Sequence, residues 1–320
     1  MRRRALIVAG SMGVLLMAAT ALARGIEAGP QDLERLHEFE RESGLDVGPD
    51  TEWFANGLSG DGAVYAIMAT DPFGSAQGAL ILDPSYRYAR VGYSWVSSAL
   101  VLGRRSLILM GLSFTGLICV GLVTFMAAGL RDQLGLKTWL LVLNPALFIG
   151  ALYDTAEPLA IVLLVAGFVA GLRLCSLALA VVRPTYAVAV ANRPATFVAV
   201  IVLSILFRLV WVAHFGDSIM GGASNLAFPF TGVASSPNPV GFAVLVAGLV
   251  TLIGGIRARS WSWLAAGLLV CCLGGPVYAD PINAVRAAGM LPVLWAFGTH
   301  PELRAISGPG TTQIVANPSV

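Results

Sequence analysis

Charged residues are scarce in this chain. Only 12% of its 320 residues are Asp, Glu, Lys or Arg, whereas soluble globular domains carry about 25%. The chain also has 57% hydrophobic residues and a mean hydropathy of +0.78. Together these values exclude an ordinary soluble domain and predict an integral membrane protein.

Histidine and cysteine are scarce as well, with three and four residues. The cysteines all lie within apolar runs, and their spacing matches neither a zinc site nor a disulfide framework, so we interpret them as packing residues. The histidines are scattered over the chain and form no metal-binding pattern. The residues concerned are Cys119, Cys175, Cys271, Cys272, His37, His214 and His300.

A strong excess of positive charge is also missing, because the formal net charge is only +2. No basic cluster with interleaved aromatic residues occurs, and nucleic-acid binding needs such a surface. We therefore exclude nucleic acid as a partner.

The chain begins with a basic and then apolar segment. Arg2, Arg3 and Arg4 precede the run from Ala5 to Ala23, which is the pattern of a signal sequence or of a signal anchor. Ala21-Leu22-Ala23 resembles a cleavage site, but the run is as long as a full membrane span. We favour an uncleaved first helix.

Residues 24–103 are predicted to form a large extracytoplasmic loop with helices at the membrane interface. The part from Arg24 to Gly92 holds 12 of the 18 acidic residues, and residues 31–42 have the pattern of a short surface helix. Tyr93–Gly103 is apolar but too short to cross. It is either a short crossing or an interfacial helix anchored by Trp95, and we favour the second.

The rest of the chain predicts seven further crossings, separated by polar turns. Residues 174–192 are interrupted by Arg183-Pro184, and because proline breaks or kinks a helix we expect a re-entrant or kinked pair there. The predicted crossings are Ser106–Leu130, Leu140–Tyr153, Pro158–Leu172, Ala195–His214, Val240–Ile256, Trp261–Ala279 and Ala284–Gly298.

The predicted fold class is thus an all-α, polytopic transmembrane helix bundle with about eight crossings and both termini in the cytoplasm. One transmembrane domain occupies residues 1–298. Residues 299–320, rich in Pro, Gly, Ser and Thr, are predicted to be a disordered cytoplasmic tail.

Polar residues concentrate in Asn56–Gly103, between apolar runs. Asp61 is our candidate general base, because Gly60 and Gly62 allow close approach of a ligand and Tyr65 follows four residues later on the same helical face. The alternative is an ordinary Asp in a glycine-rich turn.

Several other ionisable residues are candidates because charges at membrane depth are costly. Arg87 and Arg90 are three residues apart, share one helical face and present donors suited to phosphate oxygens, although they also fit interfacial anchoring. Asp154 and Glu157 have the same spacing at the head of an apolar run, where acidic residues also simply favour a helix N-terminus. Further candidates on or near the same outer side are Asp83, Arg183 and Arg286.

The order of these features resembles the GT-C superfamily of membrane glycosyltransferases, which use polyprenyl-phosphate sugars. It is distantly similar to the mannosyltransferases of glycolipid-anchor synthesis. The resemblance covers about residues 5–294, through short motifs. These motifs are Asp61-Gly62-Ala63-Val64-Tyr65, Asp71-Pro72-Phe73, residues 83–93 (DPSYRYARVGY), Asn144-Pro145, Asp154-Thr155-Ala156-Glu157-Pro158, Arg183-Pro184-Thr185 and Asp280-Pro281 with Arg286.

The resemblance implies a multi-pass protein of the bacterial cytoplasmic membrane whose active face is extracytoplasmic. It would transfer mannose, or another hexose or pentose, from a lipid-linked donor to a lipid or cell-envelope acceptor, with inversion and sometimes with a divalent metal. Its partners would be the lipid-linked donor and membrane lipids. Asp61 would be the base, with Asp154 and Glu157 as further catalytic carboxylates, and the substrate-binding residues would be Tyr65, Asp83, Arg87, Arg90, Arg183 and Arg286.

A non-catalytic polyprenyl-lipid-binding or transport protein is the alternative, favoured by the short chain and by the break at Arg183-Pro184. Transport predicts a continuous polar path across both leaflets, whereas a glycosyltransferase predicts a cleft open to the outer face. No internal repeat is visible, which argues against a transporter built from two inverted halves.

Overall fold

The computed structural model describes residues 2–27, 61–75, 81, 83–170, 173–190, 194–218, 225–235 and 238–298, with a few positions between 34 and 44. Within these residues the secondary structure is helical, apart from one antiparallel bridge between Leu226 and Leu273. Most of the predicted surface helix at 31–42 and the whole tail 299–320 lie outside this part of the chain.

The helices follow one another along the whole described chain. In order they are α1 (Arg2–Glu27), α4 (Asp61–Thr70), α5 (Pro84–Tyr88), α6 (Gly92–Leu100), η3 (Arg105–Leu107), α7 (Ile108–Gly129), α8 (Arg131–Leu134), η4 (Gly135–Lys137), α9 (Thr138–Val142), α10 (Pro145–Leu152), α11 (Glu157–Ala170), α12 (Arg173–Val182), α13 (Pro184–Ala187), η5 (Val188–Val190), α14 (Pro194–Phe215), α15 (Thr231–Ser235), α16 (Pro239–Ala258), α17 (Trp261–Cys271), α18 (Gly275–Ala279), α19 (Pro281–Ala288) and α20 (Met290–Phe297).

Within the part of the chain that the structure describes, three segments are long and apolar enough to cross a membrane: Arg105–Gly129, Ala195–Phe215 and Pro239–Ala258. A fourth span arises if Arg131–Val142 and Pro145–Leu152, which are bent by 41°, are counted as one. The all-helical class and the membrane character expected from composition are therefore supported. The three unbroken spans coincide with the crossings predicted around α7, α14 and α16.

Three predicted crossings are each divided into two helices. Leu140–Tyr153 is interrupted at Leu143 and Asn144, between α9 and α10, and Ala284–Gly298 is interrupted at Gly289. Trp261–Ala279 is interrupted between α17 and α18, where Leu273 forms the bridge to Leu226. Hydropathy predicts the length of an apolar segment, but it carries no information on the caps and tertiary contacts that end a helix within it.

Asx-Pro pairs explain several of the helix starts. Asn144, Asn238 and Asp280 each precede a proline, and the side chain of each accepts a hydrogen bond from a backbone N–H in the first turn. Proline fits the first helical position because its missing N–H would have no partner there. Asn144-Pro145 thus encodes the break between α9 and α10 locally, and Asp280-Pro281 encodes the start of α19.

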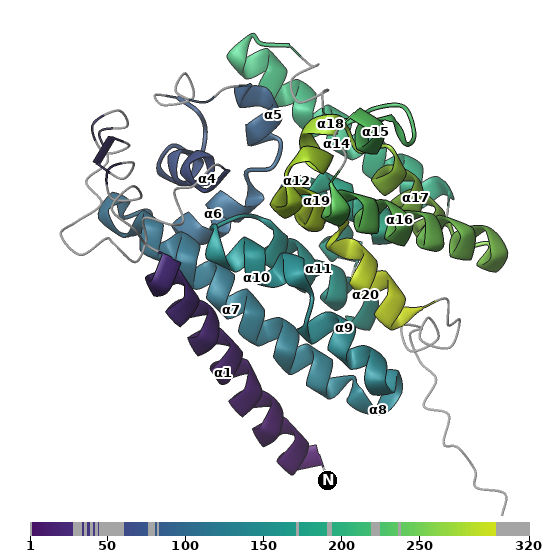
Figure 1. Ribbon diagram of the computed structural model, residues 1–320. Helices are drawn as coiled ribbons and strands as arrows, with labels where there is room; N and C mark the ends of the chain where they lie inside the picture. The colour runs from purple at the N-terminus through teal and green to yellow at the C-terminus, as the bar shows by residue number, and fades with distance from the viewer. Residues whose placement is uncertain are drawn as a thin grey trace, which may run out of the picture.

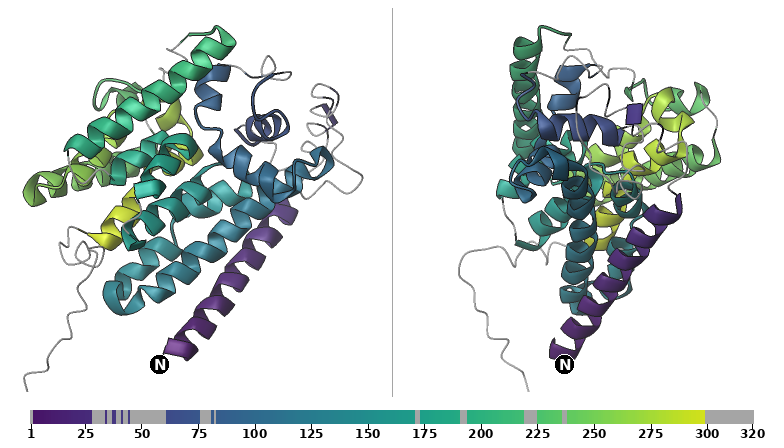
Figure 2. Two further views of the ribbon diagram at one scale, coloured as in Figure 1. Left: turned by 180° about the vertical axis from the view of Figure 1, so that it is seen from behind. Right: turned by 90° about the vertical axis from the view of Figure 1, so that its left-hand side faces the viewer.

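The long helices form a frame for the shorter ones. Figures 1 and 2 show α1 running beside α7, with α6 near one end of α7 and α8 at the other. Helices α16 and α17 pack against each other on the opposite side of the molecule. Helices α4 and α5 lie beyond the α6 end of α7, and α10, α11 and α19 lie between the two sides.

Buried tyrosines tie these elements together. Four of them are fully buried, and each hydroxyl donates a hydrogen bond of 2.6–2.7 Å to a backbone carbonyl. A buried hydroxyl without a partner is costly, so each bond fixes the position of its ring. The bonds are Tyr88 to Asp71, Tyr93 to Leu112, Tyr186 to Arg286 and Tyr278 to Val270.

Gly289 joins α19 to α20 where the backbone comes very close to other elements. A Cβ atom at this position would lie 2.2 Å from the Tyr186 hydroxyl and 2.4 Å from the Ala146 Cβ. In addition, the Asn144 side-chain amide donates a 2.7 Å hydrogen bond to the Gly289 carbonyl. Only glycine fits this junction, which sets the position of the end of α19.

We therefore expect Gly289→Ala to destabilise the protein by about 1–3 kcal/mol, the usual cost of overpacking. Thermal unfolding in detergent, followed by size-exclusion fluorescence, measures the effect. Gly129→Ala is the control, because no atom lies within 4 Å of its added Cβ. Equal melting temperatures for the two variants would contradict the close approach at Gly289.

Candidate functional site

Asp61 is the first residue of α4, and both of its carboxylate oxygens are engaged. Oδ1 forms an ion pair with Nη1 of Arg87 from α5. Oδ2 accepts a 2.8 Å hydrogen bond from Nη2 of Arg286 in α19. One carboxylate thus joins two guanidinium groups that are far apart in the sequence.

Glu157 is the first residue of α11 and is completely buried. Its Oε1 lies 2.8 Å from Nη2 of Arg183 and 3.2 Å from Nε of Arg286. Arg183 directly precedes α13, at the predicted helix break. Because Arg286 contacts both carboxylates, it joins the Asp61 pair and the Glu157 pair into one network.

Arg286 is held in place by a chain of hydrogen bonds along α19. Asp280 caps the helix and accepts a 2.9 Å bond from the Asn283 amide, and the Asn283 carbonyl oxygen accepts a 3.1 Å bond from Arg286 Nη1. The Arg286 side chain is only 7% exposed. Its guanidinium is therefore fixed by α19 itself as well as by Asp61 and Glu157.

Arg90 is buried beside this network, with 8% of its surface exposed. Its guanidinium carbon lies 4.5 Å from the centre of the Tyr86 ring, and its Nε has no hydrogen-bond partner within the described structure. None of the ion pairs found among the described residues involves Arg90. Its charge acts on Asp61 and lowers the pKa of that carboxyl, but Arg90 makes no direct contact with a described carboxylate, so its guanidinium retains donor capacity for an anionic ligand.

Tyr86 lies among three arginines. Arg208 of α14 and Arg87 lie 5.3 Å and 5.7 Å from its ring centre, in addition to Arg90, and its hydroxyl accepts a 2.9 Å hydrogen bond from Asn225. The charge of Arg90, opposed by burial, lowers the pKa of the Tyr86 hydroxyl. The aromatic face thus stabilises positive charge in this part of the molecule.

Tyr65 contributes a second unsatisfied buried group. Its side chain is 2% exposed and packs edge to face against Tyr93, with ring centres 5.3 Å apart, and its hydroxyl has no partner within the described residues. Burial raises the pKa of this hydroxyl, so it stays protonated and is a free donor. The charges of Arg90 and Arg183 act on it, which places it at the edge of the network.

We call this network the ionic cluster. It carries four guanidiniums and two carboxylates, so two positive charges are in excess. Of the helices that contribute to it, Figure 1 shows α4 and α5 on one side and α19 on the other. Its members are Asp61, Arg87, Arg90, Glu157, Arg183 and Arg286.

Electrostatics keep Asp61 ionised. Burial by itself would raise the pKa of Asp61, but the charges of Arg90, Arg286 and Arg87 outweigh burial and hold its pKa far below the usual carboxyl range. In this arrangement Asp61 is a stable anion and a weak base.

The structure brings together six of the nine residues proposed from the sequence and places Tyr65 beside them. Asp154 is buried with a φ of 48° and accepts a 3.0 Å hydrogen bond from Ser113, which ties it to α7. Asp83 is exposed and precedes α5 with a φ of 54°, without capping the helix through its side chain. Neither residue forms a described ion pair with an arginine of the cluster.

Two residues beside Tyr86, Arg208 and Asn225, were not among the nine site residues proposed from the sequence. Arg208 lies in an otherwise apolar span, and an ionisable residue there is a recognisable signal. Asn225 carries no sequence signal, because its bond to Tyr86 joins residues 139 apart.

The residues of the cluster do not fit a divalent cation. No three His, Cys, Asp or Glu side chains within the described chain are close enough to hold a metal ion. Asp61 and Glu157 each lie between two arginines, and hard cations require several free carboxylate or carbonyl oxygens instead. The metal implied by the resemblance therefore has no site here.

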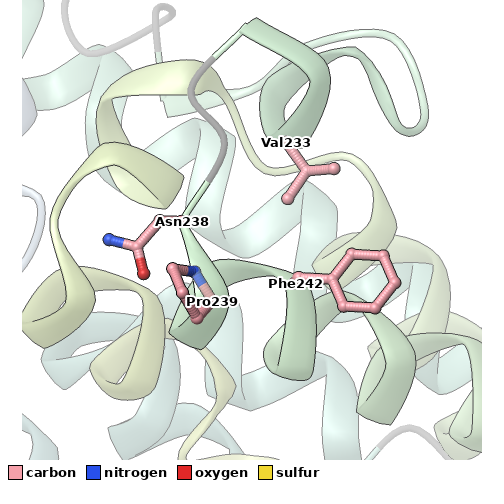
Figure 3. Close-up of a pocket in the computed structure, with 4 residues that line it drawn as sticks. All are labelled: Val233, Asn238, Pro239 and Phe242. Carbon is pink, nitrogen blue, oxygen red and sulfur yellow. The ribbon is translucent and has the colours of Figure 1, made fainter.

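A surface pocket lies elsewhere, between α15 and the start of α16 (Figure 3). It is lined by Val233, Asn238, Pro239 and Phe242. None of these residues belongs to the ionic cluster, and Asn238 already caps α16. The pocket therefore adds no chemistry to the site.

No family model matches the chain, and neither the curated proteins nor the solved structures contain a match.

Removal of the buried carboxylate should have a large effect. Glu157→Gln leaves Arg183 and Arg286 without a shared counter-charge, and we expect a loss of about 3–5 kcal/mol, as for one partner of a buried ion pair. Thermal unfolding in detergent measures it. The double variant Glu157→Gln with Arg183→Met should recover part of the loss, whereas wild-type stability of Glu157→Gln would contradict the pairing.

The lowered pKa of Asp61 gives a prediction for pH. A depressed carboxyl pKa adds stability above the unfolded value of about 4, and this stability is lost only as the pH falls through the much lower folded value. The difference in melting temperature between wild type and Asp61→Asn should therefore be constant from pH 5 to 8. A difference that shrinks between pH 7 and 5 would show that Asp61 is not held by its arginines.

Proposed function

We propose that this chain is a membrane glycosyltransferase of the GT-C type. It transfers a sugar, a hexose such as mannose or a pentose, from a polyprenyl-phosphate donor to a lipid or cell-envelope acceptor. The observation that carries the proposal is the ionic cluster, in which a carboxylate adjoins an excess of buried guanidiniums.

The charge of the cluster matches the chemistry of the leaving group. A polyprenyl-phosphate sugar is a phosphodiester with one negative charge, and the departing polyprenyl phosphate is a monoester with about −1.5 to −2 charges at neutral pH. The cluster has two positive charges in excess. It would thus stabilise the leaving group more strongly than the bound donor, and such a difference lowers the barrier.

Arg90, Arg183 and Tyr65 are the groups that would receive the phosphate. Nε of Arg90, Nε of Arg183 and the Tyr65 hydroxyl are all buried donors without a partner in the described structure. Guanidinium forks bind phosphate oxygens by paired, charge-assisted hydrogen bonds. A phosphate bound in the cluster would supply acceptor oxygens for such donors.

Asp61 would accept the proton of the acceptor hydroxyl. It is 20% exposed, more than Glu157 at 0%, so an acceptor can reach it while Glu157 holds Arg183 and Arg286 in position. A base opposite a stabilised leaving group suits an inverting transfer. Asp154 accepts a hydrogen bond from Ser113 of α7 and would help to hold the helices around the site in position.

The proposal includes the topology expected from the sequence. The cluster would face the outside of a bacterial cytoplasmic membrane, in a multi-pass chain with about eight crossings. The helix breaks at Asn144, Arg183 and Gly289 support it, because interrupted helices at membrane depth usually line a site.

A non-catalytic protein that binds a polyprenyl lipid is the second candidate. Both oxygens of Asp61 are occupied by arginines, and this observation favours binding without catalysis. In such a protein the cluster would still hold a phosphate, but Asp61 would be only a structural counter-ion.

Two variants separate the candidates. Asp61→Asn should lower sugar transfer from a radiolabelled polyprenyl-phosphate mannose by about 10²–10⁴-fold, the usual contribution of a general base, while polyprenyl-phosphate binding persists. Arg90→Gln should weaken that binding by roughly 10–150-fold, because a hydrogen bond to a charged group contributes about 1.5–3 kcal/mol.

Asp132→Asn and Arg104→Gln are the matched controls, since both side chains are exposed and outside the cluster. Binding without any transfer by the wild-type protein, over a range of donor sugars and acceptors, would favour the second candidate. Full transfer by Asp61→Asn would remove the proposed base.

A further inference from the structure

We propose that Arg87 is a latch on Asp61, closed in the free protein and opened by the phosphate of the bound lipid. This inference rests on the proposed function and concerns how that site is regulated. It follows from the unequal way in which the two arginines of Asp61 are held.

Arg286 is the fixed partner. It contacts Asp61, Glu157 and Asn283, and its side chain is 7% exposed. The carbonyl of the same residue accepts a 2.6 Å hydrogen bond from the buried Tyr186 hydroxyl. Both its backbone and its guanidinium are therefore anchored, and a ligand could not move it without breaking several contacts.

Arg87 is the movable partner. Its side chain is 26% exposed, it projects from a helix of only five residues, and Asp61 is its ion-pair partner in the described structure. Its other side-chain contact is a loose one with the Tyr86 ring, 5.7 Å from the ring centre. Opening this pair breaks one partly exposed ion pair. Its free-energy cost is far smaller than that of moving Arg286, which would break several buried contacts.

The ligand can compete for Arg87 because of where Arg90 lies. The two arginines are three residues apart on one turn and both lie over the Tyr86 ring. A phosphate bound by Arg90 would therefore be within reach of Arg87. Arg87 contacts only one oxygen of Asp61, whereas a phosphate offers several acceptor oxygens. The guanidinium of Arg87 would therefore leave Asp61 and bind the phosphate.

The exchange would activate the base in two ways. Oδ1 of Asp61 loses its hydrogen-bond donor, so a lone pair becomes free for an incoming hydroxyl. The carboxylate also loses one of the charges that lower its pKa and gains an anionic neighbour, which raises the pKa further. Asp61 thus becomes a stronger base only when a donor is present.

The proposed reaction is a single displacement step. The acceptor O–H bond breaks and its proton moves to Asp61 Oδ1, while the acceptor oxygen bonds to the anomeric carbon. The bond from that carbon to the phosphate oxygen breaks, and the electron pair leaves on the polyprenyl phosphate, held by Arg87 and Arg90. After the product leaves, Asp61 gives its proton to water and Arg87 returns to it.

Chemical labelling of Asp61 tests the latch without any turnover. A hydrophobic carbodiimide reacts with protonated carboxyl groups, so its rate at fixed pH follows the pKa, tenfold for each unit. In wild-type protein at pH 6, peptide mass spectrometry should show slow labelling of Asp61, and polyprenyl phosphate should accelerate it roughly tenfold or more. Polyprenyl alcohol, which lacks the phosphate, should leave the rate unchanged.

Without lipid, Arg87→Gln should label faster than wild type, although Arg90 and Arg286 still lower the pKa of Asp61, and polyprenyl phosphate should add little. Arg104→Gln is the matched control and should behave as wild type. Thermal shift with polyprenyl phosphate reports binding in parallel. Binding without any change in Asp61 labelling, or labelling of folded Arg87→Gln at the wild-type rate, would overturn the latch and leave the proposed function in place. Absence of binding would overturn both.

Discussion

The cost of removing charges from water constrains the site more than any other interaction. A carboxylate or a guanidinium at a helix junction is tolerated only if opposite charges meet it there. Glu157 is completely buried, and the two arginines that neutralise it come from the start of α13 and from α19. Asp61 connects α4 to α5 and α19 in the same way. Five elements, α4, α5, α11, α13 and α19, thereby meet at one point.

Long apolar segments were predictable, because crossing a bilayer demands length and hydropathy that a sequence displays directly. For this reason α7, α14 and α16 were found with nearly correct limits. The interruptions within three other segments were not found, although one of them carries an Asx-Pro signal. Asn144 is a helix cap followed by proline, which hydropathy ignores. At Gly289 the reason is tertiary, since the backbone passes Tyr186 at a distance that no side chain allows.

The sequence allowed all six members of the ionic cluster to be proposed, but not the different contacts that each of them makes. Spacing placed Arg87 and Arg90 on one helical face and gave them the same role. In the structure one pairs with Asp61 and the other lies buried over Tyr86 without a carboxylate. The pattern of a single turn cannot distinguish them, because the difference comes from α4 and α14. Asn225 was beyond reach for the same reason, since an isolated amide in a glycine-rich loop has no periodicity.

The bond between Arg286 and Asp61 spans 225 residues, which has a consequence for biosynthesis. Chains are made and inserted from the N-terminus, so both carboxylates of the cluster emerge long before α19 does. Until then Asp61 has Arg87 and Arg90 as counter-charges, and Glu157 has Arg183. Insertion of α19 supplies the shared arginine and completes the site. The ionic cluster is therefore completed only when α19 is inserted. A nascent chain that stops before α19 contains the other three arginines of the cluster but lacks the one that joins its two carboxylates.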